Sequence, residues 1–326
     1  MTVGQLIDLY IKRRVAGRLK SARGVEHRLR RALAPMLGRH ADEIRRRDMR
    51  QLLDDVADRD LKSEADKRRH TIGTMFRWAM SLDFVAIDPT AGLASYGVET
   101  SSDRVLSAEE IGKLWPWLAS AGVPVDCRDV LRLELALGAR CGEIAGMVAD
   151  EIDSAKWLWT LPPERSKNGT ARVTPLVGIA RDILRSRLDV ATQRLLFPTG
   201  TGKPSTSSHI GQMLLHRQTR LPIAGFTSHD LRRSAATMMV ELGIALDVVA
   251  AIVGHEAGGR DTRTLVRHYV RTDLIERKRA ALEIWDRHLL SIIEGEHQSN
   301  VTQIAAQKRA PVVGRCSVRT ASKLAG

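Results

Sequence analysis

Apolar residues recur at helical spacing through most of the first ninety positions of the chain. Leu6, Ile7 and Tyr10, for example, would line one face of a helix. The same spacing predicts amphipathic helices over residues 4–15, 21–37, 42–58 and 63–82. We expect these helices to form a compact bundle that ends at Asp88-Pro89, where proline stops the helical pattern.

The pattern resumes after a stretch that has little apolar periodicity. Ser107 and Glu110 have the spacing of a capping box, which predicts a helix that runs to Leu118. A further helix is predicted over residues 128–146. Helical spacing returns near Ala180 and continues, with two breaks, to Ile293.

Between residues 152 and 177 the pattern is typical of short strands. Trp157, Trp159 and Leu161 come before Asn168-Gly169, and a second apolar stretch follows that pair. Asn-Gly is a strong signal for a turn between paired strands. We therefore expect a mainly α protein with a small antiparallel β-sheet.

These patterns divide the chain into four parts. We predict a helical domain over residues 1–96, a linker over 97–104, a second domain over 105–293 and a basic tail over 294–326. From residue 297 onward the tail has five basic residues and no acidic ones. We expect it to be disordered or to fold only on a partner.

Net charge narrows the class of partner. The 326 residues include 51 Lys and Arg against 38 Asp and Glu, which gives a formal net charge of +13. The first 96 residues carry 20 basic and 13 acidic side chains, so about half of the excess lies in the helical domain. Such an excess calls for a polyanionic partner, of which nucleic acid is the leading candidate.

Cysteine spacing and hydropathy exclude other classes of protein. Cys127, Cys141 and Cys316 lie far apart, so neither a disulfide framework nor a structural zinc site is indicated. No apolar stretch is long enough to cross a membrane. Asp8 and Lys12 interrupt the N-terminal segment where a secretory signal would need apolar residues. We expect an intracellular protein.

A helix start near residue 228 is a candidate phosphate site. Thr227 or Ser228 can cap the helix, and His229 and Arg232 then share one face of its first turn. Imidazole, guanidinium and outward-facing backbone amides together suit a phosphate group. The alternative is a solvated helix start on a basic protein.

Arg140 stands between two glycines in an otherwise apolar segment. Because glycine weakens a helix, Gly138 and Gly142 indicate a close approach of backbone rather than ordinary helix building. Glu143 has the spacing to hold the Arg140 guanidinium. The alternative is an ordinary surface ion pair.

Two further side chains could take part in chemistry. Lys167, beside the predicted turn, could protonate a leaving oxygen, although a lysine on a turn is usually just solvated. Tyr269 is the only tyrosine of the second domain and is a candidate nucleophile. The alternative for Tyr269 is a packed side chain with a satisfied hydroxyl.

Taken in order along the chain, these residues resemble the motifs of the tyrosine recombinase (phage integrase) family. The matching segments are LGARCGEI, SKNG, HDLRRSAAT, VGH and RHYV, which contain Arg140, Lys167, His229 with Arg232, His255 and Tyr269. The segment FRWAMSLDFVAIDPTAGL is similar to the end of the family's N-terminal core-binding domain. The resemblance spans roughly residues 4 to 290.

The resemblance implies a fold and a reaction. The fold would be a helical, SAM-like core-binding domain followed by an integrase-type catalytic domain. The enzyme would be a site-specific recombinase that cuts and rejoins DNA through a 3'-phosphotyrosine linkage, for integration or excision of a mobile element. No cofactor, metal or ATP would be needed.

The resemblance also implies a role for each residue. Arg140 and Arg232 would clamp the phosphate, while His229 and His255 add contacts to it and Glu143 supports Arg140. Tyr269 would attack phosphorus after losing its proton, with His229 as the candidate acceptor. Lys167 would protonate the departing 5' oxygen.

The implied partner is double-stranded DNA. Basic residues of the N-terminal domain that would contact it are Lys20, Arg23, Lys67, Arg68 and Arg69. Recombination would use a homotetramer on two sites, formed from monomers or weak oligomers without DNA, and a directionality factor is a further candidate partner. Residues 273–293 would suit docking, either onto their own domain or onto a neighbouring copy. We expect a cytoplasmic, nucleoid-associated protein encoded by a bacterium or a phage.

Two alternatives to a recombinase stay open. The chain could be an architectural or regulatory DNA-binding protein that has the same fold and does not complete strand exchange. A type IB topoisomerase would use the same nucleophile, but the recombinase motifs and the N-terminal helical domain match this sequence better.

Overall fold

The computed structural model describes the chain except for residues 18–21, 98–102, 121, 191–193, 255–270 and 296–326. It separates into two compact units, Met1–Ser101 and Ser102–Gly326. Within the described residues, no helix is both long enough and apolar enough to cross a membrane. Each unit is built around its own apolar core.

The described residues of the first unit form helices and no named strand. The α-helices there are α1 (Val3–Tyr10), α2 (Ala22–Ala32), α3 (Arg46–Ala57) and α4 (Lys62–Met80). The apolar face predicted from the sequence is the buried one: Leu6, Ile7 and Phe76 are fully inaccessible to solvent. The helix predicted over residues 4–15 changes to a π-helical turn after Tyr10, and α2 ends five residues before the predicted limit.

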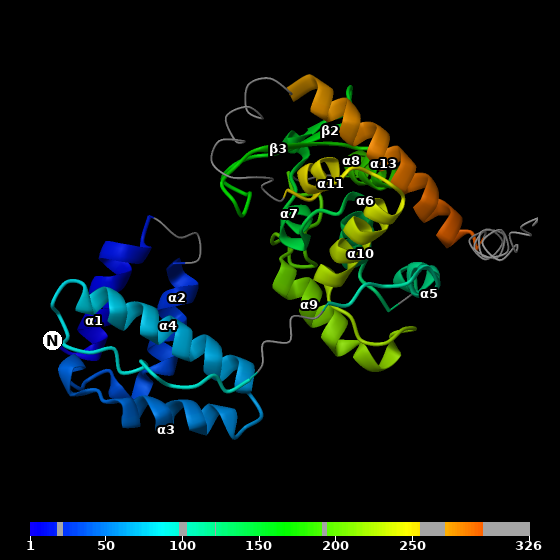
Figure 1. Cartoon of the computed structure of the whole chain (residues 1–326). Coiled ribbons are helices and arrows are strands. Elements are labelled where there is room, and N and C mark those ends of the chain that lie inside the picture. Colours follow the sequence, from blue (N-terminus) through cyan, green and yellow to red (C-terminus); the bar gives the residue numbers. More distant parts are fainter. Residues whose placement is uncertain (18–21, 98–102, 121, 191–193, 255–270, 296–326) are drawn as a thin grey trace, which may run out of the picture. The chain divides into compact units, whose positions relative to one another are not determined.

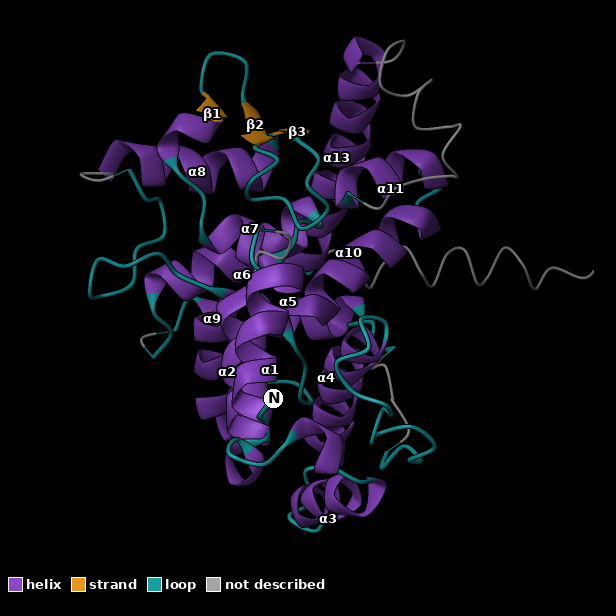
Figure 2. Ribbon diagram, turned by 90° about the vertical axis from the view of Figure 1, so that its left-hand side faces the viewer, coloured by secondary structure: helices purple, strands orange, loops and turns teal. Residues whose placement is uncertain are grey.

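The second unit is a set of helices with a small sheet at one edge, beside α8 and α13 (Figures 1 and 2). Its α-helices are α5 (Ala108–Leu118), α6 (Val125–Leu137), α7 (Cys141–Ala145), α8 (Gly178–Val190), α9 (Ser207–His216), α10 (Ser228–Glu241), α11 (Leu246–Val253) and α13 (Arg271–Ile293). The predicted fold class, mainly α with a small antiparallel sheet, is confirmed. Ser107 caps α5 through the predicted capping box with Glu110.

The sheet has three short antiparallel strands in the order β1 (Ile152–Asp153), β2 (Leu158–Leu161), β3 (Arg172–Pro175). In the β2–β3 register Trp159 pairs with Thr174, and Leu161 pairs with Arg172. Trp159 and Leu161 point into the core, as the period of two requires. Ten residues join β2 to β3, and the predicted Asn168-Gly169 turn lies within this connection between the paired strands. Gly169 does adopt the positive φ (68°) of a turn residue.

One predicted helix is broken in the structure. Instead of running over 128–146, the chain forms α6, turns at Gly138 (φ 57°) and begins α7 at Cys141. Glycine adopts this left-handed conformation without the steric penalty of a side chain, so it ends the helix. The break places Arg140 between the two helices.

The last described helix, α13, packs on its own unit. It contacts β3, α5, α6, α8 and α11. Leu282, Trp285 and Leu289 are buried, and the Trp285 indole N–H donates to the Leu135 carbonyl at 3.1 Å. Of the two arrangements open for residues 273–293, these side chains take the one within their own domain.

Candidate active site

Arg140 lies in the break between α6 and α7, immediately before the first residue of α7. Arg140 Nη1 donates to Glu143 Oε1 at 2.9 Å, which is the pair that the spacing predicted. Gly138 is needed for the break because it has a positive φ and because an added Cβ would lie 3.3 Å from Val253 Cγ1. Gly142 has no such constraint, since a Cβ there would make only an ordinary contact. The close approach inferred from both glycines therefore applies to Gly138 alone.

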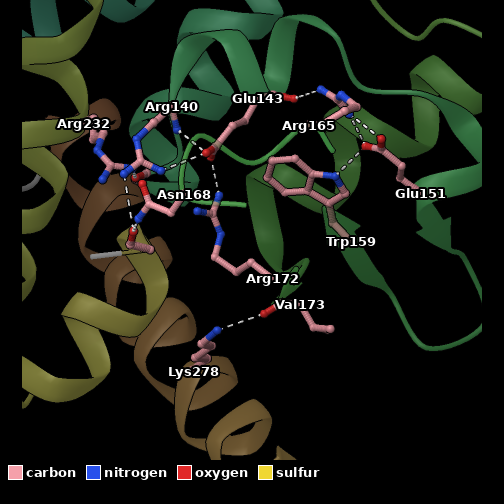
Figure 3. A network of polar contacts seen from close by, with 12 residues as sticks. Arg140, Glu143, Glu151, Trp159, Arg165, Asn168, Arg172, Val173, Arg232 and Lys278 are labelled. Carbon is pink, nitrogen blue, oxygen red and sulfur yellow. Dashed lines mark hydrogen bonds and ion pairs between the residues drawn. The ribbon is translucent and has the colours of Figure 1, made fainter. Parts of the chain in front are cut away.

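Glu143 joins two arginines. Its side chain is 4% exposed, and Oε2 accepts from Arg172 Nη2 at 2.5 Å. Burial by itself would raise the Glu143 pKa, but the charges of Arg172 and Arg140 outweigh burial and lower it. Glu143 is therefore an ionised carboxylate that positions both guanidinium groups (Figure 3).

Arg232, near the start of α10, extends its guanidinium to the break between α6 and α7. Thr227 begins this helix, with its backbone N–H and its hydroxyl both directed to Asp230. Arg232 is 2% exposed, and its Nη1 donates to the Gly138 carbonyl at 2.9 Å. Its buried Nη2 has no hydrogen-bond partner among the described residues. A buried guanidinium nitrogen without a partner is costly unless an acceptor binds there.

Electrostatics favour an anion at this cluster. Burial first, and then the positive charges of Arg140 and Arg172, lower the Arg232 pKa to about 10, so Arg232 stays protonated at neutral pH. Burial raises the pKa of nearby Glu134 well above its ordinary value. Arg140 and Arg172 pair with the ionised carboxylate of Glu143, whereas Arg232 has no ion pair among the described residues. A group of three guanidinium side chains around one such carboxylate suits a phosphate.

The loop around Gly254 brings three of the sequence motifs together. The Gly254 carbonyl accepts from Arg140 Nη2 at 3.4 Å and from Asn168 Nδ2 at 3.3 Å. Gly254 has a φ of 66°, and a Cβ there would lie 2.2 Å from Arg172 Nη1. The first arginine motif, the lysine loop and the VGH motif therefore meet at this glycine, where no larger residue fits.

His229 and Lys167 are exposed side chains beside this cluster of motifs. Partial desolvation, followed by the positive charges of Arg232 and Arg233, lowers the pKa of the His229 imidazole below its ordinary value. A neutral imidazole accepts a proton, so this shift suits a general base. Lys167 precedes Asn168 on the β2–β3 connection, whose Asn168 amide contacts Gly254.

His255 and Tyr269 lie outside the described residues, which stop at Gly254 and resume at Arg271. The role of each stays a prediction. Lys20, one of the predicted DNA contacts, also lies outside the described residues.

Sequence reasoning missed two buried basic residues, Arg172 and Lys278. Lys278, on α13, is 5% exposed and donates to the Val173 carbonyl on β3 at 3.0 Å. Burial, and then the charge of Arg172, lower the Lys278 pKa to about 8. Arg172 could have been noticed because it stands at the start of an apolar strand segment. Lys278 could not, because the carbonyl that it contacts lies 105 residues away in the sequence.

The predicted DNA contacts of the first unit differ in their surroundings. Arg23 and Lys67 are exposed. Arg68 Nε pairs with Glu64 at 3.0 Å, and Arg69 Nε pairs with Asp66 at 3.3 Å. Arg69 also donates to the Leu93 carbonyl. Arg68 and Arg69 therefore have roles inside the unit, whereas Arg23 and Lys67 face solvent.

Comparison with known proteins identifies the family of the second unit. The model of the phage integrase family matches residues 104–275, just over half of the chain. The chain belongs to this family. Tyrosine recombinase XerC of Roseiflexus castenholzii is 26% identical over 227 residues, which cover 64% of this chain and 69% of that protein. Tyrosine recombinase XerD of Ralstonia nicotianae is 28% identical over 208 residues, which cover 60% of this chain and 66% of the XerD chain.

Solved integrase structures share the fold. A lambda integrase dimer bound to a COC' core site aligns with a TM-score of 0.63 at 18% identity, covering 79% of this chain and 96% of the integrase chain. The Tn1549 transposon integrase in complex with circular intermediate DNA aligns with a TM-score of 0.60 at 15% identity, covering 82% and 99%. The predicted membership of the tyrosine recombinase family and the integrase-type fold are both confirmed.

Proposed function

We propose that this member of the tyrosine recombinase family is an active site-specific recombinase that cuts and rejoins duplex DNA through a 3'-phosphotyrosine linkage. The observation that carries the proposal is the arginine cluster: Arg140 and Arg172 pair with the Glu143 carboxylate, and Arg232 lies beside them, bound to the Gly138 carbonyl. The buried Arg232 Nη2 has no hydrogen-bond partner among the described residues. Such a group is expected where a phosphate binds during the reaction.

The proposed reaction combines these charges with the roles that the family resemblance implies for Tyr269 and Lys167. Arg140 and Arg232 bind the nonbridging oxygens of the scissile phosphate and stabilise the charge of the transition state. The Tyr269 hydroxyl loses its proton, and its oxygen attacks phosphorus while the bond to the 5' oxygen breaks. The departing 5' oxygen takes a proton from Lys167 and becomes a free hydroxyl.

His229 is the proposed acceptor of the tyrosine proton, because its lowered pKa keeps the imidazole neutral at physiological pH. His255 adds a contact to the phosphate. The phosphotyrosine conserves the bond energy, so a 5' hydroxyl from a second duplex can attack it and restore the DNA without ATP or another cofactor.

The first unit would bind the same duplex as a core-binding domain. Its proposed contacts are the exposed Arg23 and Lys67 together with Lys20, Arg68 and Arg69. Arg13 and Arg14 are further candidates: both line an open cleft with Trp78, and neither has an ion pair among the described residues. Phosphate contacts of this kind supply much of the affinity and make it depend on salt.

The biological setting proposed here is integration or excision of a mobile element in a bacterial cytoplasm, close to the nucleoid. Four protomers would act on two sites, with a directionality factor as a further partner. The lambda integrase tetramer bound to a Holliday junction, which aligns with a TM-score of 0.63, supports such an assembly.

The proposal is tested by capture of covalent DNA. The full chain is produced in cells that carry candidate target DNA, the cells are denatured rapidly, and DNA still attached to the protein is sequenced. One sharp attachment position, absent with Tyr269→Phe although binding is kept, is the expected result. Ordinary binding without covalent DNA in the wild type would instead favour the architectural or regulatory alternative.

A further inference from the structure

Three metal-ligating side chains meet at the starts of two helices in the second unit. Asp126 and Cys127 belong to the first turn of α6, and His209 belongs to the first turn of α9. The Cys127 sulfur lies 3.6 Å from His209 Nε2 and 3.8 Å from Asp126 Oδ2. His209 Nε2 and Asp126 Oδ2 are 3.5 Å apart.

These three separations match the edges of a tetrahedral metal site. Bond lengths of about 2.3 Å to sulfur and about 2.0–2.2 Å to nitrogen and oxygen place neighbouring ligands about 3.4–3.6 Å apart around zinc. Each observed separation lies within a few tenths of an ångström of those values. One metal ion can thus reach all three atoms after small side-chain shifts.

We propose that Asp126, Cys127 and His209 form a binding site for a divalent transition metal of the zinc class, with a water molecule as fourth ligand. Thiolate and imidazole select zinc-like ions over magnesium or calcium, which prefer oxygen ligands. One thiolate and one carboxylate balance the two positive charges of the ion. Cys127 is fully buried, but the His209 side chain is 39% exposed, which gives the ion access from solvent.

The neighbouring groups fix the geometry of the site. Thr206 caps α9 by accepting from the His209 backbone N–H at 3.1 Å, which sets the direction of the first turn. Burial, and then the negative charge of Asp126, raise the pKa of the Cys127 thiol to about 12, and the positive charge of Arg217 only partly opposes this shift, so the thiol is protonated until a metal ion displaces its proton. Metal binding replaces the Cys127 S–H bond with a sulfur–metal bond and releases one proton to solvent.

The site would join two helices that are far apart in the sequence. His209 is 82 residues from Cys127, so no ligand spacing in the sequence could indicate it. The helix that carries His209, α9, also contacts α7, which carries Glu143. A bound ion would therefore stabilise the part of the second unit that lies beside the arginine cluster. The metal site and the arginine cluster have no side chain in common.

Cobalt(II) binding to the purified, metal-free full chain tests the site. We expect one cobalt per chain, an intense near-ultraviolet cobalt–thiolate band, competition by zinc, and a higher melting temperature with zinc than with EDTA. Cys127→Ser should remove the band, and His209→Gln should weaken binding at least tenfold. Cys141→Ser is the matched control, because Cys141 is also a buried free thiol but is not part of the three-residue cluster. Cys316→Ser controls for the remaining thiol.

The results decide the proposal in either direction. It is overturned if the wild type shows no thiolate band, if the band persists in Cys127→Ser, or if His209→Gln binds as tightly as the wild type. Where Cys127→Ser fails to fold, His209→Gln decides, because that side chain is partly exposed and its replacement leaves the core intact.

Discussion

Among single residues, the arrangement of the charged side chains around Glu143 supports phosphate binding more strongly than any one of these side chains does alone. Glu143 forms ion pairs with both Arg140 and Arg172. Arg232 adds a further guanidinium, which donates to the Gly138 carbonyl. The cluster is incomplete without an anion, because its positive charge exceeds the charge of Glu143. This excess is the physical basis for assigning phosphate chemistry to the site.

Removing Arg172 should destabilise the protein by leaving Glu143 buried with one partner fewer. Arg172→Met is expected to lower the free energy of unfolding by about 3 kcal/mol, the lower end for a broken buried pair, because Arg140 still holds Glu143. Urea denaturation measures this loss. Adding Glu143→Gln should cost less than the sum of the two single changes. Strictly additive costs would contradict the proposed coupling.

His229 should titrate below the ordinary histidine pKa of about 6.5 in the free chain. NMR titration of its imidazole measures this value. Arg233→Gln should raise it, because Arg233 contributes positive charge and Asp230 loses its ion pair at 3.1 Å. A His229 pKa at or above 6.5 in the wild type would remove the electrostatic support for its role as a base.

The same shift links His229 to stability. Its folded-state pKa lies below the unfolded value, so the unfolded chain takes up a proton first as the pH falls. The contribution of His229 therefore favours folding above about pH 6.5 and declines as the pH drops through that value.

Prediction of the site from the sequence succeeded where the partners are close along the chain. Arg140 and Glu143 are three residues apart, and helical spacing alone indicated their contact. Arg172 lies 29 residues from Glu143, and Lys278 lies 105 residues from Val173, so only the fold brings those groups together. The three metal-ligating side chains of α6 and α9 were missed for the same reason.

At the scale of elements, local signals located the helices better than their interruptions. The capping box at Ser107 predicted the observed start of α5. The break at Gly138 was missed because α6 and α7 together look like one apolar helix, and the left-handed turn depends on packing against Val253. Asn168-Gly169 lies in the β2–β3 connection, as the turn signal indicated, but the hydrogen bond from the Asn168 amide to the Gly254 carbonyl joins residues 86 positions apart, so no local pattern in the sequence indicated it.

The two glycines that flank Arg140 offer a matched pair of substitutions. Gly138→Ala should destabilise the protein by about 1–2 kcal/mol, because alanine is strained at positive φ, and should slow DNA cleavage by displacing the carbonyl that Arg232 binds. Gly142→Ala should be neutral or stabilising by up to about 1 kcal/mol, since it lies in α7 with room for a methyl group. Thermal unfolding and single-turnover cleavage measure both effects. Equal effects of the two substitutions would contradict the structural role of Gly138.

At the scale of the whole molecule, the two compact units and the net charge of +13 suit a protein that binds duplex DNA through both units. Periodicity predicted two units, which the structure shows, whereas the polyanionic partner inferred from net charge stays a prediction. Neither periodicity nor net charge could identify which basic residues are free, because that depends on intramolecular ion pairs such as Arg68–Glu64.

Duplex binding should weaken steeply as salt rises, and Lys67→Gln should reduce the slope of log affinity against log salt by about 1. Lys67 is exposed and follows the first turn of α4. Arg30→Gln is the control, since Arg30 pairs with Asp8 and Glu26 within its own unit and should change the slope less. An equal slope for Lys67→Gln and the wild type would exclude Lys67 as a phosphate contact.

We propose that Tyr269 becomes covalently joined to DNA, and peptide mapping of the trapped complex identifies the attached residue directly. The protein is incubated with a nicked duplex from which the cleaved end diffuses away, the complex is digested with protease and nuclease, and the modified peptide is sequenced by mass spectrometry. We expect a 3'-phosphonucleotide on Tyr269 and none in Tyr269→Phe. Attachment at Tyr10, Tyr96 or any other residue, or attachment that survives Tyr269→Phe, would contradict it.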